Sequence, residues 1–128
     1  MTFYYQQVLK IRQELYPNEY LCKQVIQGKL FMDRQLESSL TLNEIAKEAA
    51  LSKFHFIRLF KKMYGQTPYQ YLTIVRIEQA KRLLRTGKSV KEVCFAVGFD
   101  STSSFTGLFK KITGSTPISY KNRQLSHR

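Results

Sequence analysis

The sequence has few of the residues that build metal centres, with two cysteines and two histidines among its 128 residues. Cys22 and Cys94 are isolated and form no Cys-x-x-Cys pair, and His55 and His127 are also well separated. A zinc site needs clustered nitrogen and sulfur ligands, so the pattern argues against a metal site and predicts no cofactor. It leaves a Cys22–Cys94 disulfide open, but it is typical of reduced thiols in a cytoplasmic protein.

Long apolar runs are also missing. No stretch approaches the roughly 18 apolar residues that a membrane-spanning helix requires. Residues 1–7 lack both the basic start and the apolar segment of a secretory signal. The sequence therefore predicts a cytoplasmic protein with no membrane partner. Its 43% hydrophobic and 23% charged residues are the composition of a folded domain and not of a disordered chain.

Acidic residues are scarce in the second part of the chain. The 21 Lys and Arg residues outnumber nine Asp and Glu residues, which gives a formal net charge of +12. Residues 1–51 contain six residues of each sign, whereas residues 52–128 contain fifteen basic and three acidic residues and carry the whole excess. A neutral front and a basic back indicate that the back half faces a polyanion.

An internal repeat organises the chain. Phe-Lys-Lys occurs at 60–62 and at 109–111, and Gly-x-Thr-Pro occurs at 65–68 and at 114–117. Upstream, residues 42–46 resemble residues 90–94, at an offset that is one residue shorter. The second copy therefore has one extra residue near Asp100, and a turn, which tolerates insertions, is expected around 50–52 and 98–101.

Each copy has the pattern of helix, turn and helix. Thr41-x-x-Glu44 and Ser89-x-x-Glu92 fit the capping box, so the first helices are expected over about 41–49 and 89–97. The second helices carry apolar residues at helical spacing, expected to form core faces. These residues are Phe56, Leu59, Phe60 and Met63 in the first copy, and Phe105, Leu108, Phe109 and Ile112 in the second. Gly65 and Gly114 are expected to end these helices.

Further helices are expected outside the repeated pairs. Thr67-Pro68 and Thr116-Pro117 each place a hydroxyl cap before a first-turn proline. From Pro68 the helical pattern continues to about Arg85 and predicts one helix of about 18 residues that joins the copies. Residues 4–15 and 18–36 are expected to be helical, and no alternating strand pattern occurs. The predicted fold class is all-α, with homeodomain-like three-helix units.

The second helix of a helix-turn-helix can enter the major groove of DNA. Opposite its apolar face, the first copy carries Arg58, suited to bidentate contact with guanine, and Phe54 and Ile57, suited to thymine methyl groups. The corresponding face of the second copy is small and polar, with Thr102, Ser103 and a central Gly107. We expect the first copy to supply most of the direct base contacts.

Phosphate contacts are predicted from the basic residues around these faces. They are Lys53, His55, Lys61, Lys62, Arg76, Lys110 and Lys111. The alternative is a basic face that is merely solvated, and His55 can equally pack or face solvent. Two helix-turn-helix units in the segment that carries the charge excess favour DNA binding. A linking helix of 18 residues is about 27 Å long, which would let one chain reach two major-groove segments about 34 Å apart without dimerising.

These residues resemble the AraC/XylS family of bacterial transcription regulators over about residues 21–121. The motifs that carry the resemblance are Leu42-x-x-Ile45-Ala46, residues 52–62, Arg76-Ile77-x-x-Ala80-x-x-Leu83-Leu84, Val97-Gly98-Phe99-Asp100, and Ser104-Phe105-x-x-Leu108-Phe109-Lys110-Lys111-x-x-Gly114-x-x-Pro117. The resemblance implies two helix-turn-helix subdomains that each insert a recognition helix into the major groove. It places Phe54, Ile57 and Arg58 of the first unit, and Thr102 and Ser103 of the second, against the bases. Many members have arginine where this chain has Gly107.

The resemblance also implies an organisation and partners. The expected segments are an N-terminal helical extension (1–40), a first helix-turn-helix (41–67), a linking helix (68–86), a second helix-turn-helix (87–123) and a tail (124–128). Most members carry a sensing or dimerisation domain, for which residues 1–40 are too short. A chain that is the whole protein would resemble the short members, which act as monomers, and an activator is expected. A chain that is part of a longer protein would have its sensing domain elsewhere. The expected partner is double-stranded promoter or operator DNA, with RNA polymerase as a candidate second partner.

Two other functions deserve comparison. A DNA alkylation repair enzyme would need a zinc-activated thiolate with several cysteine ligands, and only Cys22 and Cys94 are present. A protein-interaction module, or an antagonist of a larger regulator of the same family, would use the neutral and aromatic segment 1–40 to pack on its partner. The primary prediction is a sequence-specific transcription regulator and not an enzyme.

Overall fold

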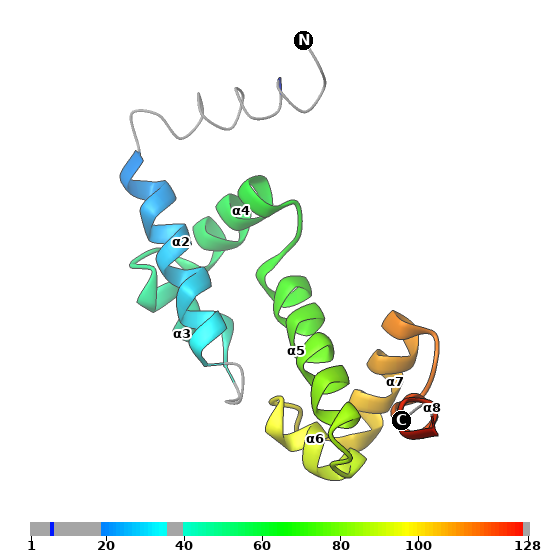
Figure 1. Cartoon of the computed structure of the whole chain (residues 1–128). Coiled ribbons are helices and arrows are strands. Elements are labelled where there is room, and N and C mark those ends of the chain that lie inside the picture. The colour runs from blue at the N-terminus through cyan, green and yellow to red at the C-terminus, as the bar shows by residue number, and fades with distance from the viewer. Residues whose placement is uncertain (1–5, 7–18, 36–39, 127–128) are drawn as a thin grey trace. The chain divides into compact units, whose positions relative to one another are not determined.

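The computed structural model describes residue 6, residues 19–35 and residues 40–126, and it contains seven helices and no strand in these ranges (Figure 1). The helices are α2 (Glu19–Arg34), α3 (Leu42–Glu48), α4 (Lys53–Tyr64), α5 (Pro68–Arg85), α6 (Val90–Ala96), α7 (Thr102–Thr113) and α8 (Pro117–Ser126). The predicted all-α fold is confirmed. α2 corresponds to the helix predicted over 18–36, whereas the helix predicted over 4–15 lies, apart from residue 6, outside the described residues.

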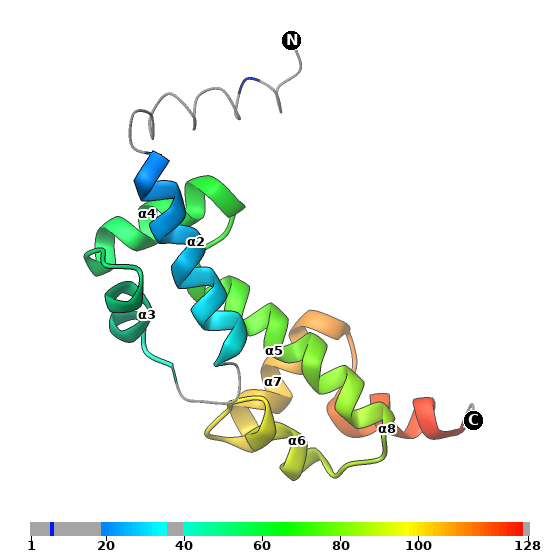
Figure 2. The ribbon, with the colours of Figure 1, turned by 60° about the vertical axis from the view of Figure 1, so that its left-hand side comes forward.

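The chain divides into two compact units. The described part of the first contains α2, α3, α4 and the start of α5 up to Gln70, and the second contains the rest of α5 with α6, α7 and α8. Within the first unit α3 packs against α4, and α2 packs against both of them (Figure 2). Within the second unit α6 packs against α7. No helix in the described ranges is both long and apolar enough to cross a membrane.

Side-chain caps fix where the short helices begin. The Glu44 N–H donates to Thr41 Oγ1 at 3.2 Å, and the Glu92 N–H donates to Ser89 Oγ at 3.1 Å. Ser89 Oγ also donates to Glu92 Oε1 at 3.1 Å. The hydroxyl half of both predicted capping boxes is therefore present. The helices begin one residue after each cap, because the N-cap residue keeps extended backbone angles.

The linking helix α5 is continuous over 18 residues, as predicted. Its start is closed by a reciprocal pair of bonds, since the Gln70 N–H donates to Thr67 Oγ1 at 3.1 Å and the Thr67 N–H donates to Gln70 Oε1 at 2.9 Å. Pro68 occupies the first turn, where its missing N–H has no helical partner to lose. The helix ends before Gly87, which has a φ of +94°.

The repeat also includes α2 and α5, whose similarity the alignment of the two copies within the sequence did not detect. α2 buries Val25, Gly28 and Met32, and α5 buries residues of the same spacing, namely Ile77, Ala80 and Leu84. Each set lies at i, i+3 and i+7, one face of a helix. The residue types differ between the copies, so self-similarity is visible only in the burial pattern. The repeated helices are thus α2, α3 and α4 in the first unit and α5, α6 and α7 in the second. These are the homeodomain-like three-helix units that were predicted.

Three predicted core residues are less buried than expected. Leu108 and Met63 are only half-buried, and Ile112 is 40% exposed. Met63 and Ile112 lie in the last turn of a 12-residue helix, which is longer than its seven-residue partner in the same unit. A seven-residue helix is about 10 Å long and cannot cover a helix of about 18 Å. The core instead uses the earlier turns, where Phe56, Phe60, Phe105 and Phe109 are fully buried.

The turns inside the two helix pairs differ by one residue, as the repeat offset predicted. Residues 49–52 connect α3 to α4, whereas residues 97–101 connect α6 to α7. In the second unit the left-handed position is Gly98, with a φ of +96°. In the first unit it is Ala50, with a φ of +58°. The Ala50 carbonyl accepts a bond of 3.2 Å from Gln24 Nε2, which ties this turn to α2.

Gly28 allows α2 to approach the first helix pair closely. A Cβ atom at this position would lie 2.6 Å from Phe56 Cε1 and 3.2 Å from Ala49 Cβ. The Phe56 ring is fully buried and packs against Phe60 with centroids 5.6 Å apart, so a shift of this ring would disturb the core. Gly28 is therefore required by packing inside the protein.

Replacement of Gly28 by alanine is expected to lower the free energy of unfolding by about 1–3 kcal/mol through overpacking, despite the better helix propensity of alanine. Gly107→Ala is the matched control, because nothing lies within 4 Å of a Cβ atom there. That variant should raise the free energy of unfolding by about 1 kcal/mol. Urea denaturation followed by circular dichroism measures both. Equal shifts in the two variants would contradict the close packing at Gly28.

Ala50→Gly is expected to raise the free energy of unfolding by about 0.5–1 kcal/mol, because relief of the left-handed backbone outweighs the entropy gained by the unfolded chain. The reciprocal change Gly98→Ala should lower it by about 1–2 kcal/mol. The same denaturation experiment tests the pair. A destabilised Ala50→Gly protein would show that the alanine side chain, and not the backbone, determines stability at this turn.

Candidate nucleic-acid interface

The second helix of the first pair, α4, is held by signals at both ends. Ser52 caps its start, where the His55 N–H donates to Ser52 Oγ at 3.2 Å. Gly65 ends it with a φ of +76°, and the Gly65 N–H donates to the Lys61 carbonyl at 2.8 Å. Because Phe56, Leu59 and Phe60 are buried, the opposite face of α4 must point out of the unit.

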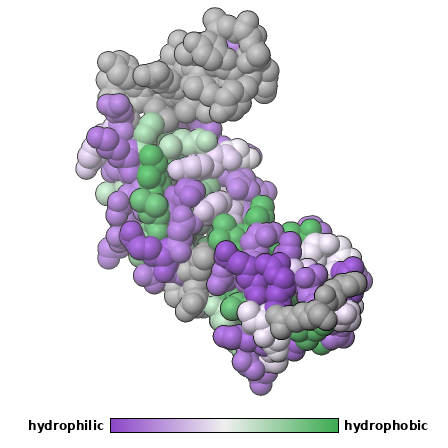
Figure 3. Space-filling view, in the orientation of Figure 1, coloured by the Kyte–Doolittle hydropathy of each residue, from purple (hydrophilic) through white to green (hydrophobic). Residues whose placement is uncertain are grey.

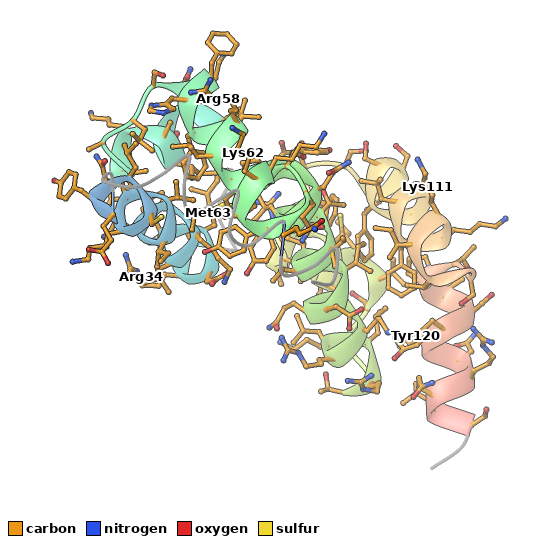
Figure 4. The ribbon with its side chains drawn as sticks, turned by 90° about the horizontal axis from the view of Figure 1, so that it is seen from above. Arg34, Arg58, Lys62, Met63, Lys111 and Tyr120 are labelled. Carbon is orange, nitrogen blue, oxygen red and sulfur yellow. The ribbon has the colours of Figure 1, made fainter. Side chains whose placement is uncertain are left out.

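The outer face of α4 carries one large aromatic residue and several cations. Phe54 is 76% exposed in the first turn, and Arg58, Lys61 and Lys62 are exposed further along. Arg58 and Lys62 project from the same side of α4 (Figure 4). Phe54 has the highest exposed fraction among the large hydrophobic residues that the structure describes.

Three predicted contact residues at α4 are less exposed. Ile57, Lys53 and His55 are all half-buried. The Lys53 ammonium lies 5.3 Å from the centroid of the Phe54 ring, a cation–π distance. This contact places a positive charge beside the aromatic group at the start of the helix. The start of α4 therefore presents an exposed aromatic ring with an ammonium group beside it.

The second recognition helix, α7, has the same framework with different outer residues. Ser101 caps its start by accepting from the Ser104 N–H at 3.3 Å, and Gly114 ends it with a φ of +89°. Phe105 and Phe109 are buried, with ring centroids 5.7 Å apart. The predicted contact residues of α7, with Gly107 between them, are all exposed, namely Thr102, Ser103, Lys110 and Lys111.

The first turn of α7 is rich in hydroxyl groups. Ser103 Oγ lies 2.8 Å from Ser101 Oγ, so one of these side chains donates to the other. Ser104 is also exposed and occupies the position that His55 has in α4. Sequence reasoning omitted Ser104, although the offset of the repeat assigns it to this face. The two recognition helices thus present a cationic, aromatic surface and a small, hydroxyl-rich surface.

Arg76 differs from the other predicted phosphate contacts. It lies in the middle of α5 and is half-buried, whereas the lysines of α4 and α7 beyond the first turn are exposed. Its stem is therefore packed within the protein, and only part of the side chain faces solvent. Long cationic side chains commonly bury their stems in this way.

A further basic group lies at the connection between α5 and α6. Arg85, Lys88 and Lys91 are exposed there. In homeodomain-like units the connection between the first and second helices contacts the DNA backbone, so this group is a candidate phosphate site in the second unit. The prediction from sequence missed it, and the available signal was the cluster of cations between two helical segments.

The electrostatics of both recognition helices are one-sided. Neither α4 nor α7 contains an acidic residue, and each has two lysines in its last turn. Burial raises the pKa of the Tyr64 phenol, which Lys29 partly opposes, and burial with the nearby Asp100 raises the pKa of the Cys94 thiol. Both groups stay protonated at neutral pH and add no negative charge. Hydrophilic residues cover most of the described surface in Figure 3.

The described residues contain no group of three or more His, Cys, Asp or Glu side chains placed to hold a metal ion. Cys22 and Cys94 are both free thiols, and Cys94 is buried. The Cys94 thiol lies 3.9 Å from the Phe99 carbonyl, at the turn between α6 and α7. It is thus a packing residue of the second unit.

Sequence comparison identifies a family. The profile of a helix-turn-helix domain family matches residues 34–123. The chain is 38% identical over 94 residues to the MmsAB operon regulatory protein of Pseudomonas aeruginosa, covering 73% of this chain and 31% of that protein. It is 38% identical over 97 residues to the transposon Tn10 TetD protein of Escherichia coli, covering 75% and 70% of the two chains. The chain thus spans about a third of the length of the first relative.

A third relative combines regulation with enzymatic activity. The bifunctional transcriptional activator and DNA repair enzyme AdaA of Bacillus subtilis is 36% identical over 97 residues, which cover 75% of this chain and 45% of that protein. The matched family and fold are those of DNA-binding regulators and not of enzymes.

Two solved structures have the same fold. The DNA-binding domain of AdpA, in complex with a target DNA, is 30% identical with a TM-score of 0.77, covering 81% of this chain and 95% of that chain. An AraC-type regulator from Chromobacterium violaceum is 26% identical with a TM-score of 0.72, covering 80% and 92%. With the family profile extending over both helix pairs, the chain belongs to the AraC-type helix-turn-helix family of DNA-binding transcription regulators.

Proposed function

We propose that this protein is a sequence-specific transcription activator that inserts α4 and α7 into adjacent major-groove segments of promoter DNA. The observation that carries the proposal is the pair of recognition helices, each anchored by two buried phenylalanines and free of carboxylates on its outer face. An α-helix fits the width of the major groove. The AdpA domain, which has this fold, was solved with its target DNA.

Base contacts come mainly from α4. Arg58 is exposed in the middle of the helix, where a guanidinium group can donate to guanine O6 and N7 together. Phe54, one turn earlier, and the half-buried Ile57 offer apolar surface to thymine methyl groups. On α7, Thr102 and Ser103 make shorter contacts. The first unit therefore supplies most of the sequence discrimination.

Affinity comes mainly from phosphate contacts. We assign these to Lys53, His55, Lys61, Lys62, Arg76, Lys110 and Lys111, and add the exposed Lys88 and Lys91 of the second unit. Each neutralised phosphate releases counterions, so binding weakens as salt concentration rises. Two units in one chain, joined by a helix of 18 residues, provide a bipartite site for a protein that binds as a monomer in the cytoplasm.

Activation requires contact with the transcription machinery, and RNA polymerase is the proposed second partner. The relative AdaA is named as a transcriptional activator, which favours this direction of control. Transcription in vitro with purified bacterial RNA polymerase and a promoter containing the selected site tests it. The proposed role requires more transcript when the protein is added, and less transcript would identify a repressor.

Arg58→Ala is expected to weaken binding to the selected site by about 1–3 kcal/mol and to relax preference at one base pair, because the bidentate contact is lost. Selection of binding sites from random duplexes, at one stated salt concentration, measures both effects. Lys61→Ala on the same helix is the control, since it removes a charge without removing a base contact. An unchanged motif with Arg58→Ala would contradict the base-reading role.

Lys110→Ala is expected to weaken binding to all sequences by a similar factor. It should also reduce the slope of log binding constant against log salt concentration by about 1, because one phosphate contact disappears. Titration of specific and scrambled duplexes at several salt concentrations provides the slopes. A changed sequence preference, with an unchanged slope, would mean that Lys110 contacts a base.

A further inference from the structure

Gly107 is unusual among the glycines of this chain. Gly65, Gly87, Gly98 and Gly114 have positive φ angles, which favour glycine. The helical Gly28 is required by its close approach to Phe56. Gly107 has neither reason, since it is helical, has no positive φ and would find nothing within 4 Å of a Cβ atom. Because glycine weakens a helix interior relative to alanine, the space at Gly107 is kept at a cost to stability.

The missing side chain of Gly107 leaves open space between its exposed neighbours on the outer face of α7, and we name this space the notch. Residues three and four positions away are its neighbours on a helix surface. Toward the N-terminus these are Ser103 and Ser104, and toward the C-terminus they are Lys110 and Lys111, all exposed. The backbone of α7 is uncovered at Gly107. Short hydroxyl side chains border the notch on its N-terminal side, and long cationic side chains border it on its C-terminal side. On α4 the same position carries Arg58.

We infer that Gly107 is a specificity-determining residue whose missing side chain lets α7 approach the base edges closely and accommodate the 5-methyl group of a thymine. The inference rests on the proposed insertion of α7 into the major groove. The thymine methyl projects into that groove, and glycine is the residue that permits close approach of backbone to a ligand.

The residues around the notch support a steric mode of recognition. α7 contains no Arg, Asn or Gln. Of the side chains that make bidentate contacts with guanine or adenine in the major groove, it has only Lys110 and Lys111, both in its last turn. Lys110 and Lys111 are long enough to reach phosphates beside the groove, while Ser103 and Ser104 add little bulk between helix and DNA. The second unit therefore recognises its half-site by fit, and the first by hydrogen bonds from Arg58.

The test combines Gly107→Ala with thymine-to-deoxyuridine replacement, which deletes only the methyl group. Each thymine of the selected second half-site is replaced in turn, and binding of both proteins is measured by titration. Gly107→Ala should be thermally more stable than the wild type by a few degrees, yet bind the thymine duplex about tenfold more weakly. Deoxyuridine at one position should restore most of that loss, whereas wild-type binding changes by a smaller factor.

Ser103→Ala is the matched control, because it changes the same face without adding bulk to the notch. Because Ser103 is itself a proposed base contact, this variant should weaken binding to the thymine and deoxyuridine duplexes by the same factor. The response of binding to the deoxyuridine replacement should therefore be as in the wild type. Bases selected by the first unit should be the same for the wild type and Gly107→Ala, since α4 is unaltered.

The outcomes separate this inference from the function on which it rests. If the wild type selects no duplex, the proposed DNA-binding function is wrong. If it selects a bipartite site but Gly107→Ala binds equally well, only the notch is disproved. A second half-site without thymine, or a loss of affinity that no deoxyuridine restores, also overturns the thymine assignment. Rescue at a single position supports it.

Discussion

The two recognition helices are positioned by one repeated interaction, the burial of two phenylalanines four residues apart. Phe56 and Phe60 in α4, and Phe105 and Phe109 in α7, are fully buried, and the rings are tilted in the first pair and edge to face in the second. Each buried aromatic side chain contributes about 1.5–3 kcal/mol relative to exposure. Because a helix has one buried face, this anchoring determines which residues remain outside to meet DNA. The contact surface is thus a consequence of the core.

The first helix of each unit must leave room for these rings. In the first unit Gly28 occupies the contact point, and a side chain there would overlap the Phe56 ring. In the second unit the matching position of the burial pattern is Ala80, which is also small and fully buried. Each unit thus combines a small buried residue, on α2 or α5, with two buried phenylalanines, on α4 or α7. The two units pack in the same way with different residues.

Much of this arrangement could be predicted from the sequence, because helix ends carry strong local signals. Thr41, Ser89 and the Thr67-Pro68 step located three helix starts, and the spacing of the phenylalanines located the inner faces of α4 and α7. Burial of Ile112 was predicted wrongly, because periodicity does not reveal where a short partner helix ends. The correspondence between α2 and α5 was missed, because residues such as Val25 and Ile77 differ in type and share only their burial. At the interface, periodicity predicted the outer faces but could not identify Lys88 and Lys91, which lie where α6 begins and no long helical pattern exists.

The ends of the recognition helices make α4 and α7 comparable segments. Each begins after a capping serine, Ser52 or Ser101, and finishes at a left-handed glycine, Gly65 or Gly114. All the difference in turn length lies before the serines. The stretches from serine to glycine are therefore equal in length and share two buried phenylalanines, so the outer residues can diversify while the scaffold stays the same. Exchange of one serine-to-glycine stretch for another of the same length should therefore change the binding preference and leave the surrounding fold as it is.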